Sequence, residues 1–302
     1  MSTAATPRIE LALGPCFFNW PAARLRDFYA AIADEAPVER VYLGEVACGK
    51  RAPLTDKLWP ELTERLERAG KTVVTALPAL PLTARDRWNA AQKAANAPHV
   101  EINEPGALAA RAGRPFAIGP FVPVYNAATL ALLHARGAES WCAPADVMLE
   151  ELATIAAAVP SVAVELFAFG RRPLAVGARC DHAPAVGRAD TGCRFACERH
   201  GDGMELAAPD GRPGRAVSGV QTLSLAVEVA AVAPERLAAS GVHRLRLSPH
   251  RLDMVEVATT FRALLDGALA PEAASARLAA MTLPDADGDG AAVIRSRAQA
   301  VI

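Results

Sequence analysis

Hydrophobic and polar positions follow a repeating order along this chain, in which short apolar segments alternate with longer amphipathic ones. The apolar segments are often β-branched and recur at intervals of roughly 20 to 30 residues, which is typical of repeated βα units. Residues 58–69 place Leu58, Leu62 and Leu66 on one face and predict a helix, as do residues 127–136. The eight predicted strands are residues 9–13, 41–43, 72–76, 99–102, 116–119, 140–142, 163–168 and 244–247.

Eight βα units predict an α/β fold of the (β/α)8 TIM-like barrel type, with an open doubly wound sheet as the alternative. The period breaks at residues 169–240, which include a stretch rich in Gly, Pro and Asp at 201–214. We interpret residues 169–240 as an insertion after strand seven that makes the barrel irregular. The expected domains are a barrel over residues 1–266 that includes the insertion, and a C-terminal helical tail over residues 267–302.

Composition narrows the classes of partner. The chain has 302 residues, of which 52% are hydrophobic and 22% charged, and its net charge is −1. These values indicate neither disorder nor a surface for polyanions, so no nucleic-acid partner is expected. The apolar runs fall short of the roughly 20 residues that span a bilayer, and Glu10 interrupts the N-terminal one, so we expect no export and a cytoplasmic location.

Cysteine is the residue type whose positions indicate chemistry. Cys48 stands alone after the second strand, and Cys180, Cys193 and Cys197 lie in the insertion with the spacing C-x12-C-x3-C. Loops that follow the strands of a βα barrel meet at one end, so Cys48 is expected to reach the other three. Thiolates on a metal centre carry negative charge, which nearby cations would balance, although cations would equally suit an activated thiol. The neighbouring basic residues are Lys50, Arg51, Arg179, Arg194 and Arg199.

The residues alone leave three interpretations of these thiols open: an iron–sulfur cluster, a zinc site, or unrelated buried cysteines. Structural zinc sites usually combine two close pairs of cysteines, whereas this chain has one close pair. His182 and His200 could complete a zinc site, but each also fits a solvent-facing loop. Cys16 and Cys142 are interpreted as buried spectators. Residues 285–290 resemble a calcium loop but lack its final glutamate, because the twelfth position is Ser296.

Several charged residues fall within or directly after predicted strands. Glu165 interrupts an apolar strand, and the alternation of strand eight places Arg244 and Arg246 on one face, directed into the barrel mouth. Arg246 is expected either to pair with Glu165 or to bind a carboxylate-bearing substrate. The remaining candidates are Glu45, Glu101 and Glu104, as acid–base groups or as solvated or ion-paired rim residues, and Asn126, as a helix N-cap.

Seven segments resemble the UbiV-like proteins of bacterial ubiquinone biosynthesis, a branch of the collagenase-like (U32) peptidase family. They run in order from about residue 11 to residue 250. The matching segments are LGPCFFNWP at 13–21, YLGEVACGKR at 42–51, YNAATL at 125–130, WCAP at 141–144, RRPLAVGARC at 171–180, GVQTLS at 219–224 and LRLSP at 245–249.

The resemblance implies a 4Fe-4S cluster on Cys48, Cys180, Cys193 and Cys197. It further implies a heterodimer with a UbiU-like paralogue, a UbiT-like lipid carrier, and O2-independent hydroxylation of a prenylated phenol precursor of ubiquinone with prephenate as oxygen donor. We add the hypothesis that Arg246 or Arg244, with Glu165 nearby, serves substrate binding. A non-catalytic cluster-bearing scaffold, a metal-dependent peptidase and an RNA-hydroxylation protein are the alternatives.

Overall fold

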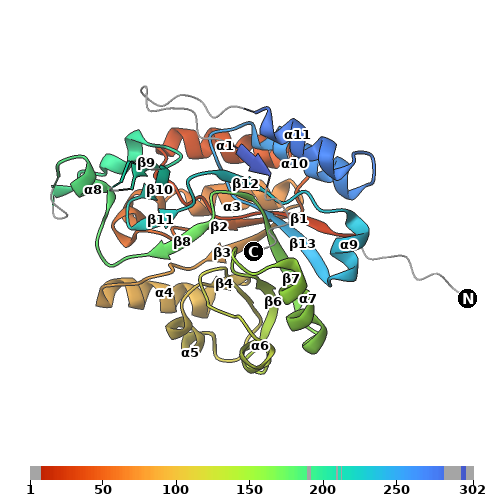
Figure 1. The fold of residues 1–302 in the computed structure, drawn as a ribbon. Helices are drawn as coiled ribbons and strands as arrows, with labels where there is room; N and C mark the ends of the chain where they lie inside the picture. Colours follow the sequence, from red (N-terminus) through yellow and green to blue (C-terminus); the bar gives the residue numbers. More distant parts are fainter. Residues whose placement is uncertain (1–7, 189–191, 209, 212, 282–293, 297–302) are drawn as a thin grey trace, which may run out of the picture.

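The computed structural model describes residues 8–188, 192–208, 210–211, 213–281 and 294–296. Eight parallel strands form a closed barrel, because β13 pairs with β1 on one side and with β7 on the other (Figure 1). The closure confirms the predicted TIM-like barrel and excludes the open sheet. The barrel strands are β1 (Glu10–Leu13), β2 (Arg40–Leu43), β3 (Thr72–Ala76), β4 (Val100–Ile102), β5 (Phe116–Ile118), β6 (Ala138–Cys142), β7 (Ala163–Gly170) and β13 (Val242–Leu247).

Helices alternate with the strands and cover the outside of the barrel (Figure 1). In α3, Leu62 and Leu66 are buried against the sheet, as their spacing predicts. The N-cap of α6 is Asn126, whose Oδ1 accepts a hydrogen bond from the backbone of Thr129. The principal covering helices are α1 (Ala22–Asp34), α3 (Trp59–Arg68), α4 (Ala84–Asn96), α5 (Leu108–Arg111), α6 (Ala127–His134), α7 (Leu149–Ala158), α9 (Pro234–Ala239) and α10 (Met254–Leu265). Short helical turns follow β2 and β4, as η1 (Gly49–Arg51), α2 (Ala52–Thr55) and η2 (Pro105–Ala107).

Successive side chains along each barrel strand point alternately outward to the helices and inward to the barrel axis, which gives the core two layers. Residues such as Leu11 and Leu245 belong to the larger cluster between strands and helices. Residues one position away, among them Ala12, Tyr42 and Phe167, form a smaller cluster inside the barrel. Because strand side chains alternate between faces, charged residues at the inward positions are enclosed by the barrel.

The insertion folds as a small antiparallel sheet beside the barrel mouth, with strand order β8-β11-β10-β9 (Figure 1). Its elements are β8 (Pro173–Val176), α8 (His182–Ala185), η4 (Ala196–Arg199), β9 (Met204–Ala207), β10 (Pro213–Ser218) and β11 (Gln221–Leu223). The chain then returns to the barrel through β12 (Val227–Val229), which pairs antiparallel with the end of β7.

Three sets of hydrogen bonds attach the insertion to barrel loops. The indole of Trp20 donates to the carbonyl of Gly201, and the amide of Gln221 donates to the carbonyl of Phe17 at 2.9 Å. The carboxylate of Asp202 accepts from both the backbone and the guanidinium of Arg251, each at 2.8 Å. These bonds fix the insertion relative to the loops after β1 and β13.

The segment predicted as a helical tail contains a helix and a strand. Helix α11 (Pro271–Ala279) packs against α10, and β14 (Ile294–Ser296) pairs in parallel with β12. The calcium-like segment 285–290 lies outside the described residues. Among the helices of the described ranges, none has both the length and the apolar character needed to cross a bilayer.

Candidate metal centre

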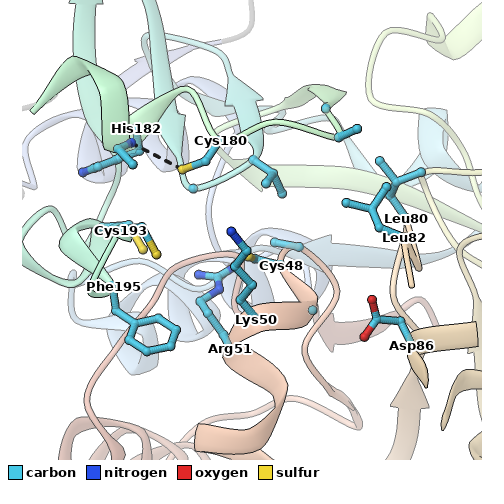
Figure 2. Close-up of a pocket in the computed structure, with 18 of the residues that line it drawn as sticks. Cys48, Lys50, Arg51, Leu80, Leu82, Asp86, Cys180, His182, Cys193 and Phe195 are labelled. Atoms are coloured by element: carbon cyan, nitrogen blue, oxygen red, sulfur yellow. Dashed lines mark hydrogen bonds between the residues drawn. The ribbon is translucent and has the colours of Figure 1, made fainter. Parts of the chain in front are cut away.

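The four cysteines singled out in the sequence line one cavity of about 120 Å³. Cys48 comes from the loop after β2, and Cys180, Cys193 and Cys197 come from the insertion. Figure 2 shows Cys48, Cys180 and Cys193 around the same space, with Arg51 and Phe195 beside them and Leu80 on the far side. The fold therefore gathers thiols that are more than a hundred residues apart in sequence.

The loop that carries Cys48 is held by one carboxylate. Oε1 of Glu45 accepts hydrogen bonds from the backbone of Ala47 at 3.0 Å and of Cys48 at 2.9 Å. It also accepts one from Nη2 of Arg51 at 2.9 Å. The loop begins at Gly44, where a Cβ atom would overlap the carbonyl oxygen of Ala76 on the neighbouring strand. The position of Cys48 thus depends on a glycine and on a buried ion pair.

Cys193 and Cys197 flank a turn of unusual backbone conformation. Arg194 and Phe195 both have positive φ, at 44° and 53°, in the left-handed region that side chains other than glycine rarely adopt. The backbone of Ala196 then donates to the carbonyl of Cys193 at 3.0 Å. Such conformations cost free energy and cluster at functional sites. Here the turn brings both thiols to the same cavity.

Two backbone features of the insertion complete the cavity wall. The N–H group of Ala183, in α8, donates to the sulfur of Cys180 at 3.3 Å. The β10–β11 turn approaches the other side, where a Cβ atom on Gly219 would lie 4.0 Å from the Cβ of Cys48. Hydrogen bonds to sulfur are among the features by which proteins stabilise and tune metal-bound thiolates.

Arg51 provides positive charge behind the thiols. Its side chain is 1% exposed and forms an ion pair with Glu45. Two of its buried nitrogens, Nε and Nη1, have no hydrogen-bond partner among the residues that the structure describes. A buried donor without an acceptor is costly, and such groups call for a specific explanation. An anionic iron–sulfur centre on the four thiolates fits these donors, so the residues present suit the group.

Burial favours the protonated form at two of the four thiols. It raises the pKa of Cys48, and it raises the pKa of Cys197 to about 11, while Arg51 opposes both shifts. Thiolate is the form that binds metals, so a metal centre must displace these protons when it binds.

The closeness of possible metal ligands to one another bears on the kind of metal centre that they could hold. Across the described residues, no three Cys, His, Asp or Glu side chains lie close enough to share one ion. A zinc site needs four donors within about 2.0–2.3 Å of a single ion. A four-iron cluster takes one thiolate at each iron, so its ligands surround a larger body. Within the described residues the structure thus holds no preformed single-ion site, and the choice between a cluster and zinc stays a prediction.

The other cysteines and the two histidines lie outside the ligand set. Cys16 and Cys142 are buried away from the cavity lining, and burial raises the pKa of Cys16 to about 12. His182 lines the cavity but is 1% exposed, and its Nε2 lies 3.1 Å from Nδ1 of His200. The expectation that His182 faces solvent was wrong, because the β10 strand and His200 cover it.

Arg246 and Glu165 lie inside the barrel, below its mouth. Nε of Arg246 donates to Glu165 at 2.7 Å, Nη1 lies 2.5 Å from Glu101, and the guanidinium stacks on the ring of Tyr42 at 3.7 Å. Arg246, Glu101 and Glu165 are each at most 1% exposed. The predicted pair of Arg246 with Glu165 is present, whereas their role in substrate binding stays a prediction.

The pKa values of the two carboxylates that pair with Arg246, those of Glu165 and Glu101, are shifted in opposite directions. Burial alone would raise the pKa of Glu165, but Arg246 and the hydroxyl of Tyr42 hold it below its usual value. Burial prevails at Glu101 and raises its pKa. The partnership of Glu101 and Tyr42 with Arg246 was missed, although strand alternation places all of them on inward positions.

The remaining sequence candidates have local roles. Glu45 is ion-paired, which was one of the alternatives for it, but its pair with Arg51 is buried and not on a solvated rim. Glu104 caps the turn η2 by accepting from the backbone of Gly106. Arg244, at the opposite end of the barrel interior from the mouth, pairs with Glu10 at 2.6 Å.

Comparison with known proteins places the chain in a family. The model of peptidase family U32 matches residues 21–286, which is most of the chain. The solved structure of the U32 peptidase Mk0906 aligns with 82% of this chain and 96% of its own, at 11% sequence identity and a TM-score of 0.43. A likeness at that level carries no argument about activity. The extent of the family match shows that this chain belongs to peptidase family U32.

Proposed function

We propose that the four cysteines hold a 4Fe-4S cluster and that this chain is the iron–sulfur subunit of an O2-independent hydroxylase in ubiquinone biosynthesis. The observation that carries the proposal is the single cavity shared by the four thiols and backed by Arg51, two of whose buried donors have no partner in the described part of the chain. A cluster on these thiolates would accept those hydrogen bonds and balance the guanidinium charge.

The chemistry that the bound cluster supplies is one-electron transfer. The residues of this chain hold and surround it: four cysteines as ligands, the N–H group of Ala183 directed at the sulfur of Cys180, and Arg51 as a buried cation. Cys48, Cys180 and Cys193 are partly exposed, so the cavity retains some contact with its surroundings.

The pathway and the partners follow from the resemblance to UbiV-like proteins. The segments that carry the resemblance also build the cavity: residues 42–51 provide Cys48 and Arg51, residues 171–180 provide Cys180, and residues 219–224 provide Gly219. On this basis we propose a heterodimer with a UbiU-like paralogue in the cytosol, a UbiT-like lipid carrier, and prephenate as oxygen donor for a prenylated phenol precursor.

Peptide cleavage, which the family name suggests, and a purely structural cluster are outcomes that experiment must separate from this proposal. The sequence contains neither an H-E-x-x-H nor a G-x-S-x-G motif. A scaffold needs only a folded cluster, whereas a redox subunit needs a cluster that gains and loses an electron reversibly.

The first experiment is anaerobic purification of the wild type, of Cys193→Ala and of Cys16→Ala, followed by iron and sulfide analysis and EPR spectroscopy. The wild type and Cys16→Ala should contain about four iron and four sulfide per chain, and Cys193→Ala should lose most of both. Stoichiometric zinc, absence of metal, or equal loss in the two variants would refute the cluster. A cluster that no reductant changes would support the scaffold instead.

A further inference from the structure

A second cavity, of about 310 Å³, lies over the barrel mouth. Its walls come from the loops after β3, β5 and β6 and from the start of the insertion, which follow the carboxyl ends of barrel strands. In βα barrels these loops carry the substrate-binding residues. The lining residues that matter here are Leu80, Phe121, Tyr125, Asp146, Arg172 and Leu174.

This cavity adjoins the candidate metal centre. Leu80 lines both cavities, and β8, which forms one wall of the second cavity, leads directly to Gly177 and Cys180 of the first. A ligand in the second cavity would therefore lie beside the four cysteines, with Leu80 as a shared wall.

Arg172 lines the cavity, and hydrogen bonds hold it in place. Nε of Arg172 donates to Glu228 at 2.7 Å. The backbone of Arg172 exchanges two hydrogen bonds with Ser224, each at 2.9 Å, so the residue is held in place. The pair with Glu228 uses Nε and orients the side chain. Arginine also has two terminal nitrogens, which suit bidentate binding of a carboxylate.

The other polar group is an acceptor. The hydroxyl of Tyr125 donates to both oxygens of Asp146, at 3.2 Å each. Asp146 and Tyr125 are both exposed, so the carboxylate can accept a further hydrogen bond from a ligand hydroxyl. The lining also includes the apolar side chains of Pro120, Phe121 and Leu174.

The rim of the cavity leaves large apolar surface uncovered. Tyr125 is 53% exposed and Leu174 is 52% exposed. Exposed apolar surface at a cavity that also presents polar groups is typical of ligand sites. A purely hydrocarbon occupant would remove Arg172 and Asp146 from water without replacing their hydrogen bonds, which is costly. The two charged groups therefore favour an occupant whose polar groups can pair with both of them.

We propose that this cavity binds a small ring-bearing organic acid, with its carboxylate on Arg172, its ring against Phe121 and Leu174, and a hydroxyl group on Asp146. The assignment of this ligand as a substrate rests on the proposed function, whereas the binding itself does not require the cluster. Arg172 thus takes the carboxylate-binding role that strand alternation suggested for Arg246, whose guanidinium faces Glu101 and Glu165 inside the barrel.

Binding of three probes by calorimetry to the anaerobically purified chain tests the proposal. 4-Hydroxyphenylacetate carries both polar groups, phenylacetate lacks the hydroxyl, and 4-hydroxyphenylethanol lacks the carboxylate. Arg172→Gln should weaken the two acids by roughly 10-fold or more, as expected for a charge-assisted hydrogen bond, and leave the alcohol unchanged. Asp146→Asn should weaken only the two probes that carry the phenolic hydroxyl.

Arg172→Lys serves as a second variant, because it keeps the charge opposite Glu228 and removes only the planar fork. It should show an intermediate loss for the acids. Arg65→Gln, an exposed arginine on α3 paired with Asp34, controls for the loss of charge. No binding of either acid to the wild type, or equal binding to the wild type and to Arg172→Gln, would overturn the proposal.

Iron content separates this inference from the proposed function. Arg172→Gln should retain the iron of the wild type, since Arg172 does not line the metal cavity. Probe binding that depends on Arg172 in a chain without a cluster would refute the proposed function and leave the cavity assignment standing. A cluster of the expected composition with no probe binding would support the proposed function and refute the cavity assignment.

Discussion

At the residue scale, Arg51 links the fold to the candidate metal centre. Its guanidinium is buried, pairs with Glu45 and faces the cavity of the four cysteines. Glu45 in turn holds the backbone of Cys48. A buried charge that loses its partner costs far more than an exposed one, so this pair should matter for stability as well as for metal binding.

We expect Arg51→Met to lower the free energy of unfolding by about 3–5 kcal/mol, the cost of leaving a buried partner unpaired. It should also lower the iron content and, in the fraction that retains iron, the reduction potential, because a nearby cation stabilises the reduced, more negative cluster. Urea unfolding, iron analysis and an EPR-monitored redox titration measure the three effects.

The control for Arg51 is Arg65→Met. Arg65 and Asp34 form an exposed pair, with side chains 45% and 57% exposed, so its loss should cost at most about 1 kcal/mol. Equal stability of the two variants, or an unchanged iron content and potential in Arg51→Met, would contradict the role given to Arg51.

At the element scale, the turn from β2 into the Cys48 loop depends on the closeness of two strands. A Cβ atom at Gly44 would overlap the carbonyl of Ala76, so β2 and β3 can lie at this spacing only with glycine at 44. The register of these strands, in which Leu43 pairs with Thr75, sets where the loop leaves the barrel.

Gly44→Ala should therefore displace the Cys48 loop and reduce iron binding strongly. Gly70→Ala is the matched control, since Gly70 has a left-handed φ of 79° but nothing within 4 Å of an added Cβ. The control should cost about 1–2 kcal/mol of backbone strain and keep its iron. Iron analysis with urea unfolding distinguishes the two, and retention of full iron by Gly44→Ala would show that the loop adapts.

The elements themselves were largely predictable. The strands follow from the alternation of short apolar segments with amphipathic ones, and the helix α3 follows from the spacing of Leu62 and Leu66. Both patterns can be seen in a short stretch of sequence. The antiparallel pairing inside the insertion was not predictable, because Gln221 pairs with Val176 across a segment that has no clear hydrophobic period.

At the scale of the whole molecule, the buried ring of His250 at the barrel mouth should make the stability of the fold depend on pH. Its ring is 0% exposed and lies against Phe18 and Phe169, and its Nε2 accepts a hydrogen bond from the backbone of Arg171. Burial lowers the pKa of His250 from 6.5 to about 4. The folded chain therefore holds this ring neutral at pH values where the unfolded chain binds a proton.

The stability contributed by the neutral ring is fully present above pH 6.5 and is lost as pH falls toward 4. Between these pH values the unfolded chain binds a proton that the folded chain does not, so acid favours unfolding. The free energy of unfolding should fall by up to about 3 kcal/mol, at about 1.36 kcal/mol per unit of pKa difference. Urea midpoints from pH 7.5 to 4.5, measured in the cluster-free Cys193→Ala background, test this.

His250→Gln should be less stable at pH 7.5 and lose less stability on acidification than its parent. His99→Gln, at an exposed position, should reproduce the pH dependence of the parent. Parallel curves for the parent and for His250→Gln would assign the acid sensitivity to other groups.

The sequence by itself determined the barrel, the place of the insertion and the four cysteines as a candidate ligand set. These features are recorded locally, in the alternation of side chains and in the position of each loop after its strand. Only the tertiary structure decided that Arg51 lies buried behind the thiols, that His182 is covered, and that Arg172 and Asp146 share a cavity. Contacts of that kind join residues far apart in the chain, and they depend on how the barrel closes and how the insertion packs against it.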